Sequence, residues 1–85
     1  MPKAAETNQA GPKASTSIDR HIGKRIRMLR EERKMTQTDL GRRLGVSFTQ
    51  VQKYERGTDR ISAARLFTIA RLFGVAIAVF FDELV

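Results

Sequence analysis

Residues 36–57 read TQTDLGRRLGVSFTQVQKYERG, and this stretch decides the fold. Its opening threonine can cap one helix, and Gly45 can end that helix because glycine tolerates the left-handed backbone of a sharp turn. Ser47 follows after a single residue and can cap a second helix, with Gln50 as its capping-box partner. Two short helices joined by so tight a glycine-containing turn are typical of a helix-turn-helix, which we place at about residues 36–56.

Helical patterns continue on both sides of this stretch. Upstream, large apolar residues from Ile18 to Leu29 recur at intervals of four, four and three, which is the spacing of one helical face. Ser17 can cap that helix, and Ser62 can cap another downstream. The last apolar run, residues 75–81, fits a short helix or a strand. No segment shows strand-like alternation, so we expect an all-α domain of four to five helices.

Length and charge indicate one small domain with a polyanionic partner. The chain has 85 residues and a formal net charge of +7. Residues 1–17 contain no large apolar residue after Met1, so we expect them to form a disordered arm before a domain at residues 18–85. The excess charge lies in the body of the chain, since residues 18–34 carry seven bases against three acids.

The residues needed for most catalytic and metal sites are missing. The chain has no cysteine and one histidine, which excludes a disulfide framework, a thiol nucleophile and a cluster of histidine ligands. We therefore expect no enzyme, no metal or other cofactor and no small-molecule ligand. No apolar stretch is long enough to cross a bilayer, so we expect no membrane partner. The absence of cysteine fits a cytoplasmic location.

The helix after Ser47 presents a face suited to DNA. With 3.6 residues per turn, Thr49, Lys53 and Arg56 fall within about 60° of one another, and Gln52 flanks them. This face carries no acid. Such side chains can hydrogen-bond to base edges in the major groove, which admits a helix. An ordinary solvated polar face is the alternative, and the tight turn together with the basic surroundings favours DNA.

A glutamate on the opposite side of this helix requires a partner. The angular position of Glu55 places its carboxylate toward the core, where an unpaired charge is costly. Arg30 lies at the margin of the apolar stripe of the first helix, and its planar fork suits a carboxylate. We predict an Arg30 to Glu55 ion pair that locks the two helices together; the alternative is a solvent-exposed Glu55.

The motifs resemble those of the Xre/Cro-like helix-turn-helix regulators, the group that includes the lambda phage repressor. The matching segments are IGKRIRMLR, MTQTDLGRRLGVSFTQVQKYERG and ISAARLFTIARLFGV. The resemblance implies a lambda-repressor-like DNA-binding domain that acts as a sequence-specific transcriptional regulator on a double-stranded operator. It also implies a bacterial or phage protein associated with the nucleoid. Many members of the family have a polar residue at the position of Phe48, so Phe48 either touches a thymine methyl or staples its helix to the core.

The resemblance also implies roles for particular residues. Gln37 would contact a phosphate, the start of the third helix would contact bases, and the residues after that helix would contact phosphates. Two roles stay open for Gln50: it reads a base, or it completes the capping box with Ser47. The complete set of expected DNA-binding residues is Thr36, Gln37, Ser47, Phe48, Thr49, Gln50, Gln52, Lys53, Arg56, Thr58 and Arg60.

One such helix covers few base pairs, so specificity requires a homodimer on two half-sites. The apolar C-terminal run supplies the expected interface, with candidates Ile77, Val79, Phe80 and Phe81. Alternatively, Ile77, Phe80 and Phe81 complete the core of the monomer. A second function also stays open, that of an antitoxin or adaptor that binds a protein partner and uses DNA binding for autoregulation.

Overall fold

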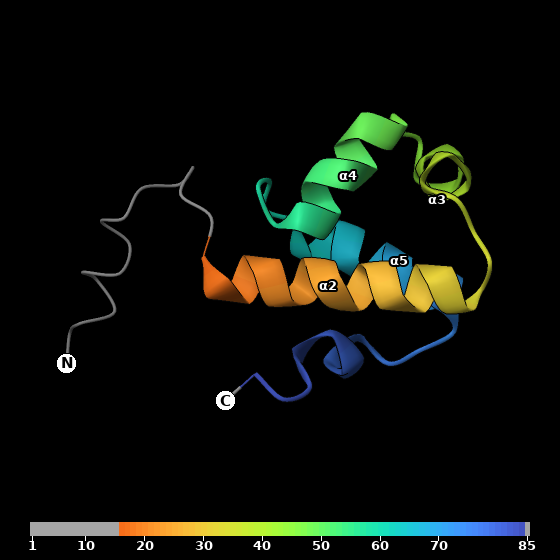
Figure 1. Cartoon of the computed structure of the whole chain (residues 1–85). Helices are drawn as coiled ribbons and strands as arrows, with labels where there is room; N and C mark the ends of the chain where they lie inside the picture. Colours follow the sequence, from red (N-terminus) through yellow and green to blue (C-terminus); the bar gives the residue numbers. More distant parts are fainter. Residues whose placement is uncertain (1–15, 85) are drawn as a thin grey trace, which may run out of the picture.

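Four α-helices and a short 3₁₀ helix form the fold of residues 16–84, the part of the chain that this computed structural model describes. Their bounds are α2 Ser17–Glu32, α3 Gln37–Leu44, α4 Phe48–Arg56, α5 Ala63–Phe73 and η1 Ile77–Phe81. No strand occurs between residues 16 and 84, which confirms the all-α prediction. Figure 1 shows α2 across the front of the molecule, with α3 and α4 on one side of it and η1 on the other.

The first helix begins one residue earlier than expected. Thr16, not Ser17, is the N-cap, because its hydroxyl accepts a hydrogen bond from the Asp19 amide at 3.1 Å while the Asp19 carboxylate accepts one from the Thr16 amide at 2.9 Å. Only a residue three positions before an acid can form this reciprocal pair. The cap of α2 is therefore Thr16, the first residue that the structure describes. The rest of the expected arm, residues 1–15, lies outside the described residues.

The other helices begin and end as the sequence predicts. The side chains of Thr36, Ser47 and Ser62 cap α3, α4 and α5. Left-handed glycines end the same three helices, and Gly45, which ends α3, has a φ of 76°. The expected capping box at α4 is only half formed, because Gln50 donates its backbone N–H to Ser47 but directs its side chain elsewhere.

The core lies where the four α-helices and η1 meet. Its fully buried side chains include Ile26 of α2, Val51 of α4 and Ile69 of α5. Phe80 of η1 is 0% exposed and completes this core. Phe80 is therefore a core residue, and its assignment as a dimer-interface candidate is wrong. The last run is a 3₁₀ helix rather than a strand, and within it Phe80 points into the core while Ile77 and Phe81 stay exposed.

Polar contacts hold η1 against α2. The Arg25 guanidinium donates to the Val79 carbonyl oxygen at 3.2 Å and lies 3.5 Å from the Asp82 carboxylate. A ring nitrogen of His21 is 2.7 Å from the Asp82 carbonyl oxygen. Val79, another interface candidate, is partly buried against the core. The C-terminal segment therefore belongs to the domain and is not a separate appendage.

Candidate nucleic-acid interface

The turn between α3 and α4 is held rigidly. The Val46 amide donates to the Gly41 carbonyl oxygen at 2.9 Å, and the Arg65 guanidinium of α5 donates to the Leu44 carbonyl oxygen at 2.7 Å. A Cβ atom at Gly41 would lie 2.6 Å from the Val46 carbonyl oxygen, so glycine is required for this approach. The turn thus fixes the angle at which α4 leaves α3.

A buried ion pair connects α4 to α2. The Arg30 guanidinium donates to both carboxylate oxygens of Glu55, with its Nε 2.7 Å from Oε2 and its Nη2 3.1 Å from Oε1. The side chains are 9% and 3% exposed, so the expected pair is present and buried. The hydrogen bond to Glu55 raises the pKa of Arg30 above its ordinary value, so Arg30 stays charged.

Two further hydrogen bonds complete this network. The third donor group of Arg30, Nη1, reaches the Met35 carbonyl oxygen at 2.7 Å in the loop before α3. The Gln37 side chain donates to Glu55 Oε1 at 3.0 Å from the first turn of α3. Every buried side-chain polar atom of the described residues has a partner. The network therefore holds α2, α3 and α4 in one arrangement.

Gln37 is thus partly engaged before any ligand arrives. Phosphate oxygens accept hydrogen bonds, so a phosphate contact requires a donor, and one amide hydrogen of Gln37 already points to Glu55. The second hydrogen and the backbone amides at the start of α3 are the donors that such a contact would use. The expected phosphate contact of Gln37 stays a prediction.

The outward face of α4 is polar or basic and exposed. Thr49, Lys53 and Arg56 are all exposed, and Gln52 is half-buried beside them. Phe48 is 51% exposed and lies outside the buried core, which disfavours its role as a staple to that core. The sequence-predicted face of α4 is therefore presented to solvent as a unit.

The segment after α4 is tied back to the protein by residues expected to contact DNA. The Thr58 hydroxyl donates to the Lys53 carbonyl oxygen at 3.3 Å. Arg60 donates to the Asp19 carboxylate at 3.3 Å from both Nε and Nη2. Burial would raise the pKa of Asp19, but the Thr16 backbone, the Thr16 hydroxyl and Arg60 together lower it. Arg60 therefore links the loop after α4 to the start of α2.

Sequence reasoning missed the contact between Gln50 and Asp59. Gln50 Nε2 donates to Asp59 Oδ2 at 2.9 Å across nine residues. Nothing in the spacing of the two residues indicates the contact, because it depends on the chain reversing at Gly57. The expected DNA-binding set omitted Asp59, although this residue holds one member of that set.

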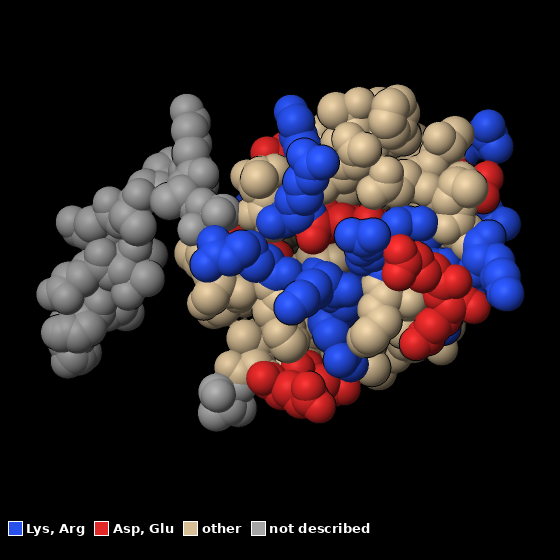
Figure 2. Space-filling model, in the orientation of Figure 1, with Lys and Arg blue, Asp and Glu red and all other residues tan. Residues whose placement is uncertain are grey.

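A basic band beside α4 was also missed as part of the site. A recess is lined by Arg20 and Lys24 of α2 and by Glu55 and Arg56 of α4. Figure 2 shows Lys and Arg side chains gathered over α2 and toward α4 on the face in view. The sequence placed Arg20 and Lys24 on one helical face, but their proximity to Arg56 follows only from the crossing of α2 and α4.

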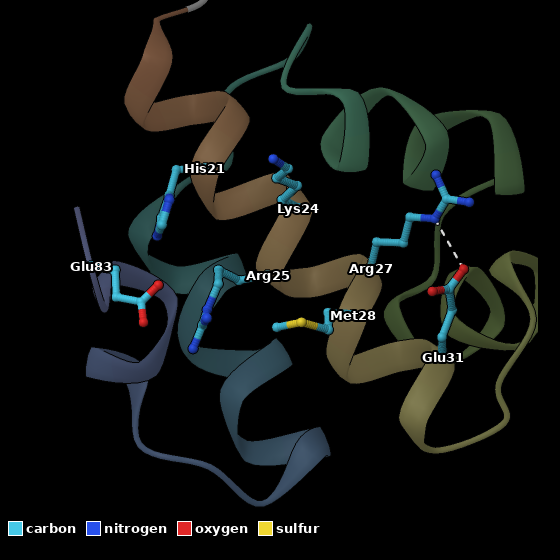
Figure 3. Close-up of a pocket in the computed structure, with 7 residues that line it drawn as sticks. All are labelled: His21, Lys24, Arg25, Arg27, Met28, Glu31 and Glu83. Atoms are coloured by element: carbon cyan, nitrogen blue, oxygen red, sulfur yellow. Dashed lines mark hydrogen bonds and ion pairs between the residues drawn. The ribbon is translucent and has the colours of Figure 1, made fainter.

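A second recess lies between α2 and the C-terminal turn. Basic side chains from the outer face of α2 line it together with Met28, Glu31 and Glu83. Figure 3 shows Arg27 directed toward Glu31, with which it forms a 3.0 Å ion pair. Both signs of charge therefore line this recess.

The described residues contain neither a metal-binding cluster nor a membrane-spanning helix. No group of His, Cys, Asp or Glu side chains among residues 16–84 could hold a metal ion. In the same part of the chain, no helix combines the length and apolar character needed to cross a membrane.

Comparison with known proteins identifies the family of this fold. A family model described as helix-turn-helix matches residues 26–80. An uncharacterized transcriptional regulator in the ATPase CF(0) region of Rhodospirillum rubrum is 51% identical over 67 residues, which cover 79% of this chain and 62% of the relative. An uncharacterized regulator of helix-turn-helix type from Sinorhizobium medicae is 44% identical over 71 residues, covering 84% of this chain and 51% of the relative. The chain thus spans about half to three-fifths of the length of these relatives.

Solved structures share the fold at lower sequence identity. The restriction-modification controller protein C.AhdI from Aeromonas hydrophila superimposes with a TM-score of 0.71 at 23% identity, covering 78% of this chain and all of that protein. The clp gene regulator ClgR from Corynebacterium glutamicum gives 0.74 at 21% identity, covering 82% of this chain and 74% of that one. The matched segment includes α3, α4 and α5 completely, and the chain belongs to the helix-turn-helix family.

Proposed function

We propose that this domain binds double-stranded DNA sequence-specifically, with α4 in the major groove, as a transcriptional regulator. The observation that carries the proposal is the exposed, acid-free face of α4, formed by Thr49, Lys53 and Arg56, on a helix fixed by the buried Arg30 to Glu55 pair. A helix that reads bases must be held at a defined angle, and this network supplies that constraint. The family match supports DNA binding rather than catalysis and does not favour the antitoxin or adaptor alternative.

Charge around α4 supports the same function. Arg20 and Lys24 line one recess with Arg56, so the helix that would read bases is bordered by groups that neutralise phosphates. Such contacts supply affinity without sequence information, whereas side chains at the start of α4 supply specificity. We propose a cytoplasmic location, at the nucleoid, as a consequence of this ligand.

A homodimer would allow two copies of α4 to read two half-sites. Exposed Ile77 and Phe81 leave an apolar surface on η1, and burial against a second copy would remove it from water. Phe80 takes no part, because it is inside the core. The homodimer rests on this exposed surface and on the small number of base pairs that one helix covers.

The decisive experiment selects bound sequences from a random duplex pool and then compares two variants. Lys53→Ala should change which base is preferred at one position. Arg56→Ala should weaken binding to all duplexes and lower the slope of log affinity against log salt by about one. Arg71→Ala, which removes an exposed arginine from α5, serves as the matched control and should leave the preferred sequence unchanged. Equal loss of affinity on every sequence in the first two variants would contradict a base-reading role for α4.

A further inference from the structure

The side-chain amide of Gln50 has one orientation in this structure. Its Nε2 lies 2.9 Å from Asp59 Oδ2. A carboxylate only accepts hydrogen bonds, and of the two ends of the amide only the nitrogen donates. The nitrogen must therefore face Asp59, and the Gln50 oxygen must face away from it. The chemistry of the pair fixes this orientation.

Asp59 is itself fixed beside α4. Its backbone amide and that of Thr58 both donate to the Lys53 carbonyl oxygen, at 3.3 and 3.0 Å. Gly57 reverses the chain with a φ of 77°, and a Cβ atom there would lie 2.6 Å from the Arg20 Cα atom. The reversal is therefore packed against α2. The Asp59 carboxylate sits on a constrained loop, so it can position a neighbouring side chain.

Gln50 lies where base contacts are expected. It occupies the first turn of α4, and its backbone amide is held by the Ser47 hydroxyl at 3.1 Å. The half-formed capping box leaves the Gln50 side chain available for another role. First-turn residues of a recognition helix are the ones that reach base edges. A freely rotating glutamine there could present either its oxygen or its nitrogen to a base.

We propose that Asp59 is a positioning residue that makes Gln50 a hydrogen-bond acceptor toward DNA, selecting adenine or cytosine over guanine at one base pair. In the major groove adenine and cytosine each present an amino donor, whereas guanine presents only acceptors. The outward Gln50 oxygen can accept from the amino groups and is repelled by the guanine oxygen. This inference rests on the proposed function, because it assigns specificity to a helix that we propose reads DNA.

Asp59→Asn tests the inference with almost no change in size. An asparagine can either accept from or donate to Gln50, so the Gln50 amide becomes free to reverse. We expect the ratio of Kd values between duplexes with guanine and with the preferred base to fall about tenfold, within the range typical of one base contact. Affinity for all duplexes should also rise, since a negative charge is lost near the phosphates. The ratio of Kd values distinguishes the two effects, because a general rise in affinity leaves that ratio unchanged.

Three comparisons distinguish positioning from charge and from folding. Glu83→Gln removes the same charge from the exposed C-terminal turn and should leave the ratio unchanged. Gln50→Ala should lose the same discrimination, and adding Asp59→Asn to it should cause no further loss. Asp59→Ala, which removes the acceptor completely, should match Asp59→Asn. Thermal melts of each variant show whether the fold is retained.

The results distinguish a failure of this inference from a failure of the proposed function. If the wild-type protein selects a sequence and folded Asp59 variants keep its base preference at every position, Asp59 has no positioning role and the proposed function stands. Loss of preference in the Asp59 variants that persists at full size in the Gln50→Ala background would also refute the inference. If the wild-type protein selects no sequence, the proposed function fails and the inference fails with it.

Discussion

Arg30→Ala should remove most of the stability of the domain. The substitution leaves the Glu55 carboxylate, 3% exposed, with the Gln37 amide as its remaining side-chain donor. Breaking a buried pair from one side costs about 3 to 5 kcal/mol, because the other charge stays buried without compensation. A domain of about 70 residues has a free energy of unfolding of about 3.5 to 10 kcal/mol. We therefore expect a large shift of the urea midpoint, measured by circular dichroism.

The same assay on other variants isolates the cause of that loss. Arg27 and Glu31 form a 3.0 Å pair on the same helix with side chains 63% and 54% exposed, and Arg27→Ala should cost about 0.5 kcal/mol or less. Arg30→Lys should also destabilise, because lysine cannot donate to both carboxylate oxygens in the geometry of a planar fork. Replacing both Arg30 and Glu55 by apolar residues of similar volume should recover much of the loss. A loss below about 1 kcal/mol for Arg30→Ala would refute the role given to burial.

Three further predictions concern the helix ends and the surface of η1. The pKa of Asp19 in the folded state is lowered below its ordinary 3.8. The extra stability of the wild type over Asp19→Asn should therefore be complete above about pH 5 and should be lost as pH falls below 4. Thermal melts of both proteins at several pH values measure this difference. Gly45→Ala should lower the free energy of unfolding by about 1 to 2 kcal/mol, because alanine is strained in the left-handed conformation, although its Cβ atom has open space. Gly57→Ala should lower it more, because its Cβ atom also meets α2. Equal losses in denaturant titrations would contradict this steric explanation. Combining Ile77→Asp with Phe81→Ser should halve the mass measured by light scattering while the melt is retained, whereas a dimer of unchanged mass would place the interface elsewhere.

The fold and the central ion pair could be predicted from the sequence because their signals are local. Ser47 and Gly57 are a cap and a terminator whose preferences depend only on backbone geometry. Glu55 is an acid on the apolar side of a short helix, and Arg30 is a base at the margin of an apolar stripe. Burial of both follows from helical periodicity, and pairing follows from the cost of burying either alone.

The remaining contacts depend on how the helices are placed in space. Gln50 and Asp59 meet only because Gly57 reverses the chain, and Arg60 reaches Asp19 across 41 residues because the loop after α4 lies over the start of α2. No periodicity carries this information. By residue type Ser17 is at least as good a cap as Thr16, and the reciprocal bond with Asp19 selects Thr16.

The position of α4 on α2 is determined twice, by steric contact and by charge. A Cβ atom at Gly23 would overlap the Tyr54 carbonyl oxygen, and one at Gly57 would lie 2.6 Å from the Arg20 Cα atom. The backbones of the two helices therefore come into direct contact at these glycines, and this contact sets the distance between the helices. The ion pair between Arg30 and Glu55 sets how far one helix slides along the other, because its two hydrogen bonds tolerate little displacement. Separation and register together fix α4 before any ligand is present, so binding does not bear the entropic cost of ordering this helix.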